Sequence, residues 1–183
     1  MYEQVSHSLL NRILDDVKPD VRKKDLRHFY TRLGANFYAI YSLFQVLYGK
    51  REDFEQQMQR VVEVMTMNYI QRGKGLKKRD RRRESDHNWF LSQELVAMAL
   101  YTNAFAGDLK GLGERLGYLQ ELGVNVLHVM PILKCPPGAS DGGYAVSDYR
   151  DVDERIGSLE DLDQLARDLH RRDMLLTLDV VVN

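Results

Sequence analysis

The chain has 183 residues, of which 44% are hydrophobic and 29% are charged, and its formal net charge is −1. This composition is typical of a folded soluble protein, and the near-zero charge gives no reason to expect nucleic acid or a membrane surface as a partner. We expect no secretory signal in the first residues, and no segment approaches the roughly 20 apolar residues that span a bilayer. Since Cys135 is the single cysteine, no disulfide can form within the chain, and we expect a cytoplasmic protein.

Hydrophobic residues recur at helical spacing through the first 70 positions. Pro19 and Gly49 interrupt the pattern, which therefore predicts about three packed helices. We expect these helices to form an N-terminal domain over residues 1–88. The hydrophobic stripes are more typical of a core than of a cofactor site, and they comprise Val5, Leu9, Ile13, Val17, Phe29, Leu33, Phe37, Ile40, Phe44, Leu47, Phe54, Met58, Val61, Met65, Met67 and Tyr69.

A basic segment, RGKGLKKRDRRRE, occupies residues 72–84. It carries two glycines and no sustained apolar period, which favours a solvated connector or a mobile loop. A nucleic-acid surface would need neighbouring aromatic residues or a recognition helix, and neither is evident there.

The second half of the chain alternates apolar strands with amphipathic helices. Strands are predicted at residues 95–100, 124–130 and 174–182, with a helix after each of the first two. This order indicates parallel pairing with right-handed crossovers, and the continuous apolar runs suggest strands buried on both faces. Three parallel strands would leave an open edge, so we expect the start of a larger α/β domain that stops partway.

The two crossover helices carry start and stop signals. Asp108 stands where the N-cap of the first helix would lie, and Gly123 ends that helix. Ser158 precedes the second helix, and Asp161 completes a capping box.

The long segment 131–158 lies after the second strand, where parallel α/β proteins place binding and catalytic loops. Its stretch SDGGYAVSDYRDVDERIGS is too polar and glycine-rich for a strand and too interrupted for a helix. Asp141 and Tyr144 flank a Gly-Gly turn, and a ring beside a carboxylate can hold a sugar; ordinary turn chemistry explains the same residues equally well. We expect the remaining charged side chains to tie the loop together by ion pairs: Asp148, Arg150, Asp151 and Asp153.

The third strand ends in two polar residues, Asp179 and Asn183. Burial of a carboxylate is costly without hydrogen bonds, so Asp179 suggests a rim position facing a polar site; a strand end that meets water is the alternative. His128, inside the second strand, is interpreted as a hydrogen-bonded core residue. No pattern for a metal, a phosphate loop or a catalytic serine is visible, so no cofactor is predicted.

The stretch FAGDLKGLGERLGYLQELGVNVLHVMPILKCPPGASDGGYAVSDYRDVDERIGSLEDL and the later LDVVVN closely resemble the start of the catalytic barrel of α-amylase-type glycoside hydrolases, family 13. Within that family the chain looks most like amylosucrases and sucrose hydrolases, which carry a helical domain before the barrel. The resemblance implies an α/β fold, with residues 89–183 forming the first three strands of an incomplete (β/α)8 TIM barrel.

The same resemblance implies site residues. Asp141 resembles an aspartate that pairs with a barrel arginine to close the glucosyl pocket, and Tyr144 resembles the tyrosine that stacks on that sugar. Asp179 and Asn183 match the first conserved region, Asp-x-x-x-Asn-His. The catalytic carboxylates belong to later regions, so no catalytic residue is assigned in this chain, and we expect no turnover by it alone.

The full-length relative would transfer the glucosyl unit of sucrose to an α-glucan or to water and release fructose. Neither a nucleic-acid nor a membrane partner is implied, and no oligomeric state is predicted. Thr102, Asn103 and Ala104 depart from the usual pattern after the tyrosine, which leaves substrate preference open. The alternatives are another family 13 enzyme (an α-amylase, a trehalose-forming enzyme or a sucrose isomerase), a non-catalytic interaction module, and an unstable remnant.

Overall fold

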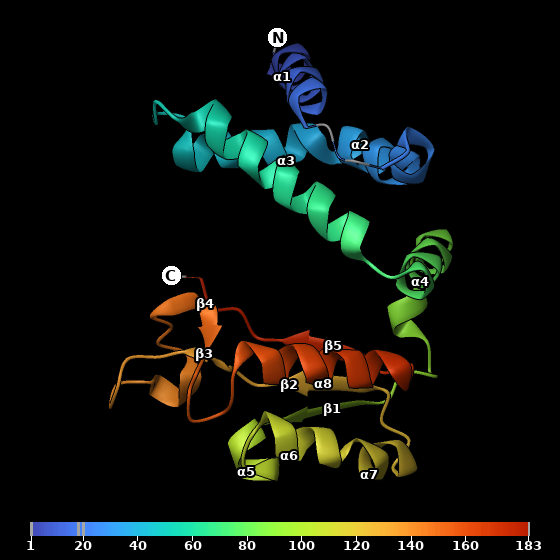
Figure 1. Ribbon diagram of the computed structural model, residues 1–183, viewed down its shortest axis with the longest axis vertical. Helices are drawn as coiled ribbons and strands as arrows, with labels where there is room; N and C mark the ends of the chain where they lie inside the picture. Colours follow the sequence, from blue (N-terminus) through green and yellow to red (C-terminus); the bar gives the residue numbers. More distant parts are fainter. Residues whose placement is uncertain (1, 18, 20, 183) are drawn as a thin grey trace. The chain divides into compact units, whose positions relative to one another are not determined.

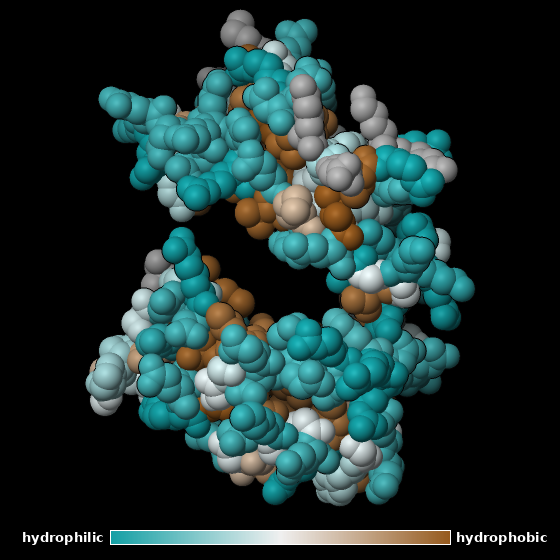
Figure 2. Space-filling view, in the orientation of Figure 1, coloured by the Kyte–Doolittle hydropathy of each residue, from teal (hydrophilic) through white to brown (hydrophobic). Residues whose placement is uncertain are grey.

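The computed structural model describes residues 2–17, 19 and 21–182, and the chain divides into two compact units, Met1–Ser85 and Asp86–Asn183 (Figure 1). Each unit has a hydrophobic core of its own. The face shown in Figure 2 is mostly hydrophilic, with hydrophobic residues visible in both units. Within the described residues, no helix has the length and apolar character needed to span a membrane.

The first unit consists of the helices α1 (Tyr2–Asp16), α2 (Lys23–Tyr48), α3 (Phe54–Gln71) and α4 (Lys74–Ser85). Helices α1, α2 and α3 contact one another and enclose the core. The predicted hydrophobic stripes supply most of this core, but Val5, Leu47 and Met67 are exposed. The buried core residues are Leu9, Leu10, Ile13, Leu33, Phe37, Tyr41, Met58 and Val62.

Helix α4 shows that the prediction of a connector or loop at residues 72–84 was wrong. Lysine, arginine and glutamate are good helix formers, and they outweigh Gly75 near the start of the helix. No residue of α4 is buried, so the helix needs no apolar stripe, and its sequence accordingly shows no apolar period. Ion pairs hold the helix instead: Arg72 binds Asp80 through two hydrogen bonds of 2.5 and 2.9 Å, and Glu84 lies 2.6 Å from Arg32.

The second unit is built on a parallel sheet, as predicted. Strands β1 (Ala97–Leu100), β2 (Val126–Val129) and β5 (Leu175–Leu178) form it in the order β1-β2-β5. The short helix η1 (Trp89–Leu91) precedes β1; the first crossover holds α5 (Thr102–Ala106), α6 (Leu109–Glu114) and α7 (Leu116–Glu121), and the second holds α8 (Leu159–Arg171). These elements match the start of a (β/α)8 barrel. Helices α6 and α8 contact each other, so both crossovers cover one face of the sheet (Figure 1).

The predicted helix caps are confirmed. The Asp108 carboxylate accepts a hydrogen bond of 2.7 Å from the Gly111 backbone N–H at the start of α6. Ser158 and Asp161 form the complete capping box of α8. These local interactions fix where each crossover helix begins, and therefore where the loop before α8 ends.

The two faces of the sheet differ, which corrects the prediction that both are buried. Leu100, Leu127 and Val129 are buried in the core that the helices share. On the opposite face Ala99, His128 and Thr177 lie side by side in register, and none of the three is buried. The prediction missed this because alternate positions of the apolar runs carry small or polar side chains, and these lie on the face that the crossover helices do not cover.

We predict that Leu127→Ala lowers the free energy of unfolding of the second unit by about 2–5 kcal/mol, because a fully buried side chain of the central strand leaves a cavity. The fluorescence of Trp89, the single tryptophan, reports this unit during denaturant unfolding. The control Leu122→Ala, at a side chain that is 50% exposed, should change the free energy of unfolding by no more than about 0.5 kcal/mol. Equal effects of the two variants would contradict the assignment of Leu127 to the core.

Candidate functional site

The long segment between β2 and α8 contains an antiparallel ribbon that the sequence did not predict. Strand β3 (Leu133–Lys134) pairs with β4 (Asp148–Val152), and the short helix η2 (Asp141–Gly143) lies between them. The composition of residues 140–158 predicts no strand, and this prediction is wrong for β4. A strand of this polarity is possible because its first residues are exposed rather than covered on both faces.

Charged side chains anchor the ribbon. Lys134 Nζ lies 3.3 Å from Asp151, and Arg155 donates hydrogen bonds of 2.8 and 2.6 Å to the two carboxylate oxygens of Asp153. The Arg155 hydrogen bond holds the pKa of the buried Asp153 carboxyl below its ordinary value. The predicted ion pairing is therefore confirmed for Asp151 and Asp153, whereas Asp148 accepts a hydrogen bond from the Arg150 backbone N–H.

Gly143 lets the loop pass close to the end of β2. Its φ is 97°, and a Cβ there would lie 3.0 Å from both the Cβ and the carbonyl oxygen of Pro131. Gly142, with a φ of 69°, also adopts the left-handed conformation that favours glycine. Together the two glycines turn the chain, and the close approach to Pro131 fixes the position of the backbone directly before Tyr144.

A hydrogen-bonded cluster forms where β5 ends. Asp179 directly follows β5, and one of its carboxylate oxygens lies 2.7 Å from His128 Nε2 on β2. The Tyr144 hydroxyl donates a hydrogen bond of 3.2 Å to the other oxygen. The His128 and Asp179 side chains are 35% and 25% exposed, so the cluster is open to solvent on one side. We call these three residues the Asp179 cluster.

The electrostatics of the cluster keep Tyr144 protonated. Partial desolvation raises the pKa of its hydroxyl above the ordinary value, and nearby Tyr101 and Asp179 raise this pKa further. Tyr101 comes directly after β1, so all three strands of the sheet contribute a residue here. A neutral Tyr144 can donate its hydroxyl hydrogen to Asp179 while its ring presents an aromatic face.

The structure brings together only some of the predicted site residues. Tyr144 and Asp179 are in contact through their side chains, whereas the Asp141 side chain is exposed and its carbonyl oxygen accepts a hydrogen bond of 3.2 Å from the Tyr144 backbone N–H. Asn183 lies outside the described residues. His128 is hydrogen-bonded as predicted, but it belongs to the half-exposed site rather than to the core. The register between β2 and β5 places His128 beside Thr177, on the same face as Asp179, and the predicted parallel pairing alone does not define that register.

Other reactive groups are absent from this site within the part of the chain that the structure describes. No group of three His, Cys, Asp or Glu side chains there is arranged to hold a metal ion. Cys135 is buried, and burial raises the pKa of its thiol, which disfavours the reactive thiolate. What the cluster offers is hydrogen-bond acceptors, a donor and an aromatic ring, a set suited to binding a polyhydroxylated ligand.

Comparison with known proteins adds a family. The family described as "Alpha amylase, catalytic domain" matches residues 78–183. An alpha-glucosidase from Schizosaccharomyces pombe is 47% identical over 103 residues, which cover 52% of this chain and 17% of that protein. An oligo-1,6-glucosidase from Bacillus cereus is 37% identical over 98 residues, covering 50% and 17%. This chain thus matches only a small part of each relative's length.

Among solved structures, the trehalulose synthase MutB from Pseudomonas mesoacidophila MX-45 is 38% identical. The match covers 49% of this chain and 17% of the synthase, with a TM-score of 0.45.

We predict that Asp179→Asn lowers the pKa of Tyr144 toward the ordinary value of about 10, because the substitution removes a negative charge. Absorbance titration of the phenolate, compared with the same titration of Tyr144→Phe, isolates this residue. Since its folded-state pKa is raised, the contribution of Tyr144 to stability is present below about pH 10 and is lost as pH rises through that pKa. Tyr149→Phe, on β4, is the control; an unchanged Tyr144 titration in Asp179→Asn would contradict the contact.

Proposed function

Because the chain belongs to the alpha-amylase catalytic-domain family, we propose that the Asp179 cluster forms one wall of a glucosyl-binding pocket in a glycoside hydrolase or glucosyltransferase. The observation that carries this proposal is the hydrogen bond between Tyr144 and Asp179 at the carboxyl end of parallel strands. That end of the sheet is where (β/α)8 enzymes place their substrates. The cluster is also partly exposed to solvent, so a ligand can reach it.

We assign the residues by their chemistry. The Tyr144 ring would stack on the apolar face of the sugar, and Asp179 would accept hydrogen bonds from sugar hydroxyls. His128 holds Asp179 from the opposite side and so fixes the orientation of the carboxylate. Asp141, exposed at the start of η2, and Asn183 are proposed as further binding residues on the strength of the family resemblance alone.

None of the described residues is assigned a catalytic role. Retaining hydrolysis needs two carboxyl groups about 5–5.5 Å apart, one as nucleophile and one as acid and base. The family resemblance places that pair in later regions of the barrel. We therefore predict that the 183-residue chain alone releases no fructose from sucrose. Fructose release above the rate of a buffer blank would overturn this assignment.

For the whole protein we propose an amylosucrase-like activity, in which the glucosyl unit of sucrose passes to an α-glucan or to water. The helical unit ahead of the sheet and the loop motifs support this choice. A second candidate is hydrolysis of other α-glucosides, favoured by the oligo-1,6-glucosidase from Bacillus cereus and a palatinase from Erwinia rhapontici, 37% and 34% identical over about half of this chain. We propose the cytoplasm as its location, from the single cysteine.

The two candidates differ in substrate. Protein expressed from the complete reading frame should release fructose from sucrose and, with glycogen present, lengthen the glucan. An oligo-1,6-glucosidase would instead release glucose from isomaltose and leave sucrose intact. Activity on isomaltose alone would replace the first candidate with the second, and inactivity on both sugars would overturn the enzyme proposal.

In the same protein, Tyr144→Ala should lower kcat/KM for the active sugar by about tenfold or more, because a buried aromatic contact with the ligand is lost. Tyr149→Ala is a matched control, since Tyr149 is 49% exposed on β4 and lies outside the cluster. Equal losses in the two variants, or none in Tyr144→Ala, would contradict the stacking role.

A further inference from the structure

The helical unit contains a cavity that the proposed function does not use. It has a volume of about 490 Å³ and lies among residues of α2, α3 and α4. We call it the α4 cavity, and the residues that matter to its chemistry are His28, Tyr69, Ile70, Lys74, Lys77 and Arg81.

The positive charges that line the α4 cavity exceed the negative ones. Of the other charged lining residues, Arg22 binds Asp25 through hydrogen bonds of 2.9 and 3.4 Å, so these two cancel. Lys77 Nζ lies 3.3 Å from the Ile70 carbonyl oxygen and 4.5 Å from the centre of the Tyr69 ring, neither of which carries a charge. Within the residues that the structure describes, Lys74 and Arg81 have no ion pair.

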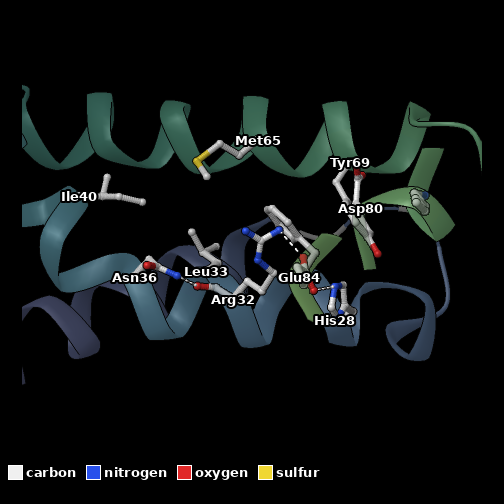
Figure 3. A pocket seen from close by; sticks show the side chains of 11 residues that line it. His28, Arg32, Leu33, Asn36, Ile40, Met65, Tyr69, Asp80 and Glu84 are labelled. Atoms are coloured by element: carbon white, nitrogen blue, oxygen red, sulfur yellow. Dashed lines mark hydrogen bonds and ion pairs between the residues drawn. The ribbon is translucent and has the colours of Figure 1, made fainter. Parts of the chain in front are cut away.

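A neighbouring cavity of about 270 Å³ provides the contrast (Figure 3). His28, Tyr69 and Lys77 line both cavities. In the neighbour, however, Glu84 pairs with His28 at 2.9 Å and with Arg32 at 2.6 Å, and much of the remaining wall is apolar. Two carboxylates, Asp80 and Glu84, therefore line the neighbouring cavity, whereas Lys74 and Arg81 line only the α4 cavity.

The spacing of the basic residues along α4 brings the charges of the α4 cavity together. Lys74, Lys77 and Arg81 are spaced three and four residues apart, so they share one face of the helix and repel one another. Lys78 and Arg82 are exposed on the same helix but do not line the cavity. Lys74 and Arg81 are exposed as well, so water screens the repulsion in part, and an anion bound between the three side chains would remove the rest.

We propose that the α4 cavity binds the phosphate group of a small organic phosphate. A phosphate monoester carries a charge of about −1.5 to −2 at pH 7. This charge balances the two lysine ammonium groups and the arginine guanidinium of the cavity better than the single charge of a carboxylate ligand would. The Tyr69 ring and the Ile70 side chain offer a surface for the organic part. The cavity volume lies within the range of about 300–1,000 Å³ that is usual for small-molecule sites. This proposal is independent of the glucosyl pocket.

Isothermal titration of the full chain with glucose 6-phosphate, adenosine monophosphate and inorganic phosphate tests the proposal. Saturable binding of either ester is the expected result, and the tighter of the two identifies the organic part. Adenosine, which lacks the phosphate, should bind at least about tenfold more weakly than adenosine monophosphate, since each charge-assisted contact contributes about that factor.

The double variant Lys74→Ala/Arg81→Ala should weaken ester binding by about tenfold or more. Lys78→Ala/Arg82→Ala removes the same charge from the same helix and should leave the affinity within about twofold, because these side chains lie outside the cavity. Circular dichroism confirms that both variants keep their helices. Equal weakening in both would indicate general attraction to a basic helix and overturn the site, as would the absence of saturable binding or equal affinity for adenosine and its phosphate.

Discussion

The carboxylate of Asp179 joins three segments that are far apart in the sequence. It follows β5, contacts His128 on β2 at 2.7 Å, and accepts the Tyr144 hydroxyl hydrogen from the long loop at 3.2 Å. Both of its oxygens are therefore used, which offsets the cost of its partial burial. Without Asp179 the Tyr144 ring would lose its hydrogen bond to the sheet, and the proposed wall of the glucosyl pocket would lose its fixed geometry.

Other features of the second unit help to form the contact between Tyr144 and Asp179. The crossover helices cover only one face of the sheet, so the opposite face, with His128, stays open. The close approach of Gly143 to Pro131 and the hydrogen bond from the Asp153 backbone N–H to the Ile132 carbonyl oxygen hold the loop that carries Tyr144 near the end of β2. Backbone conformation and backbone hydrogen bonding in the loop thus position the Tyr144 side chain.

The sequence predicted what depends on local patterns. The three parallel strands and the caps at Asp108 and Ser158 follow from periodicity and from short-range hydrogen bonding. Helix α4 was missed because its ion pairs, such as Arg72 with Asp80, replace the apolar stripe that normally reveals a helix. The role of His128 was missed because it depends on register between strands, and a parallel pair separated by a whole crossover carries no local signal of that register.

A double-mutant cycle between Tyr144→Phe and Asp179→Ala, with the affinity for D-glucose as the readout, tests the central claim most directly. The experiment uses protein expressed from the complete reading frame. If the two side chains act as one wall of the glucosyl pocket, their coupling energy should lie at about 0.5–3 kcal/mol, as for other residues in direct contact. Additive effects of the two substitutions, or glucose affinity that neither one changes, would contradict the account.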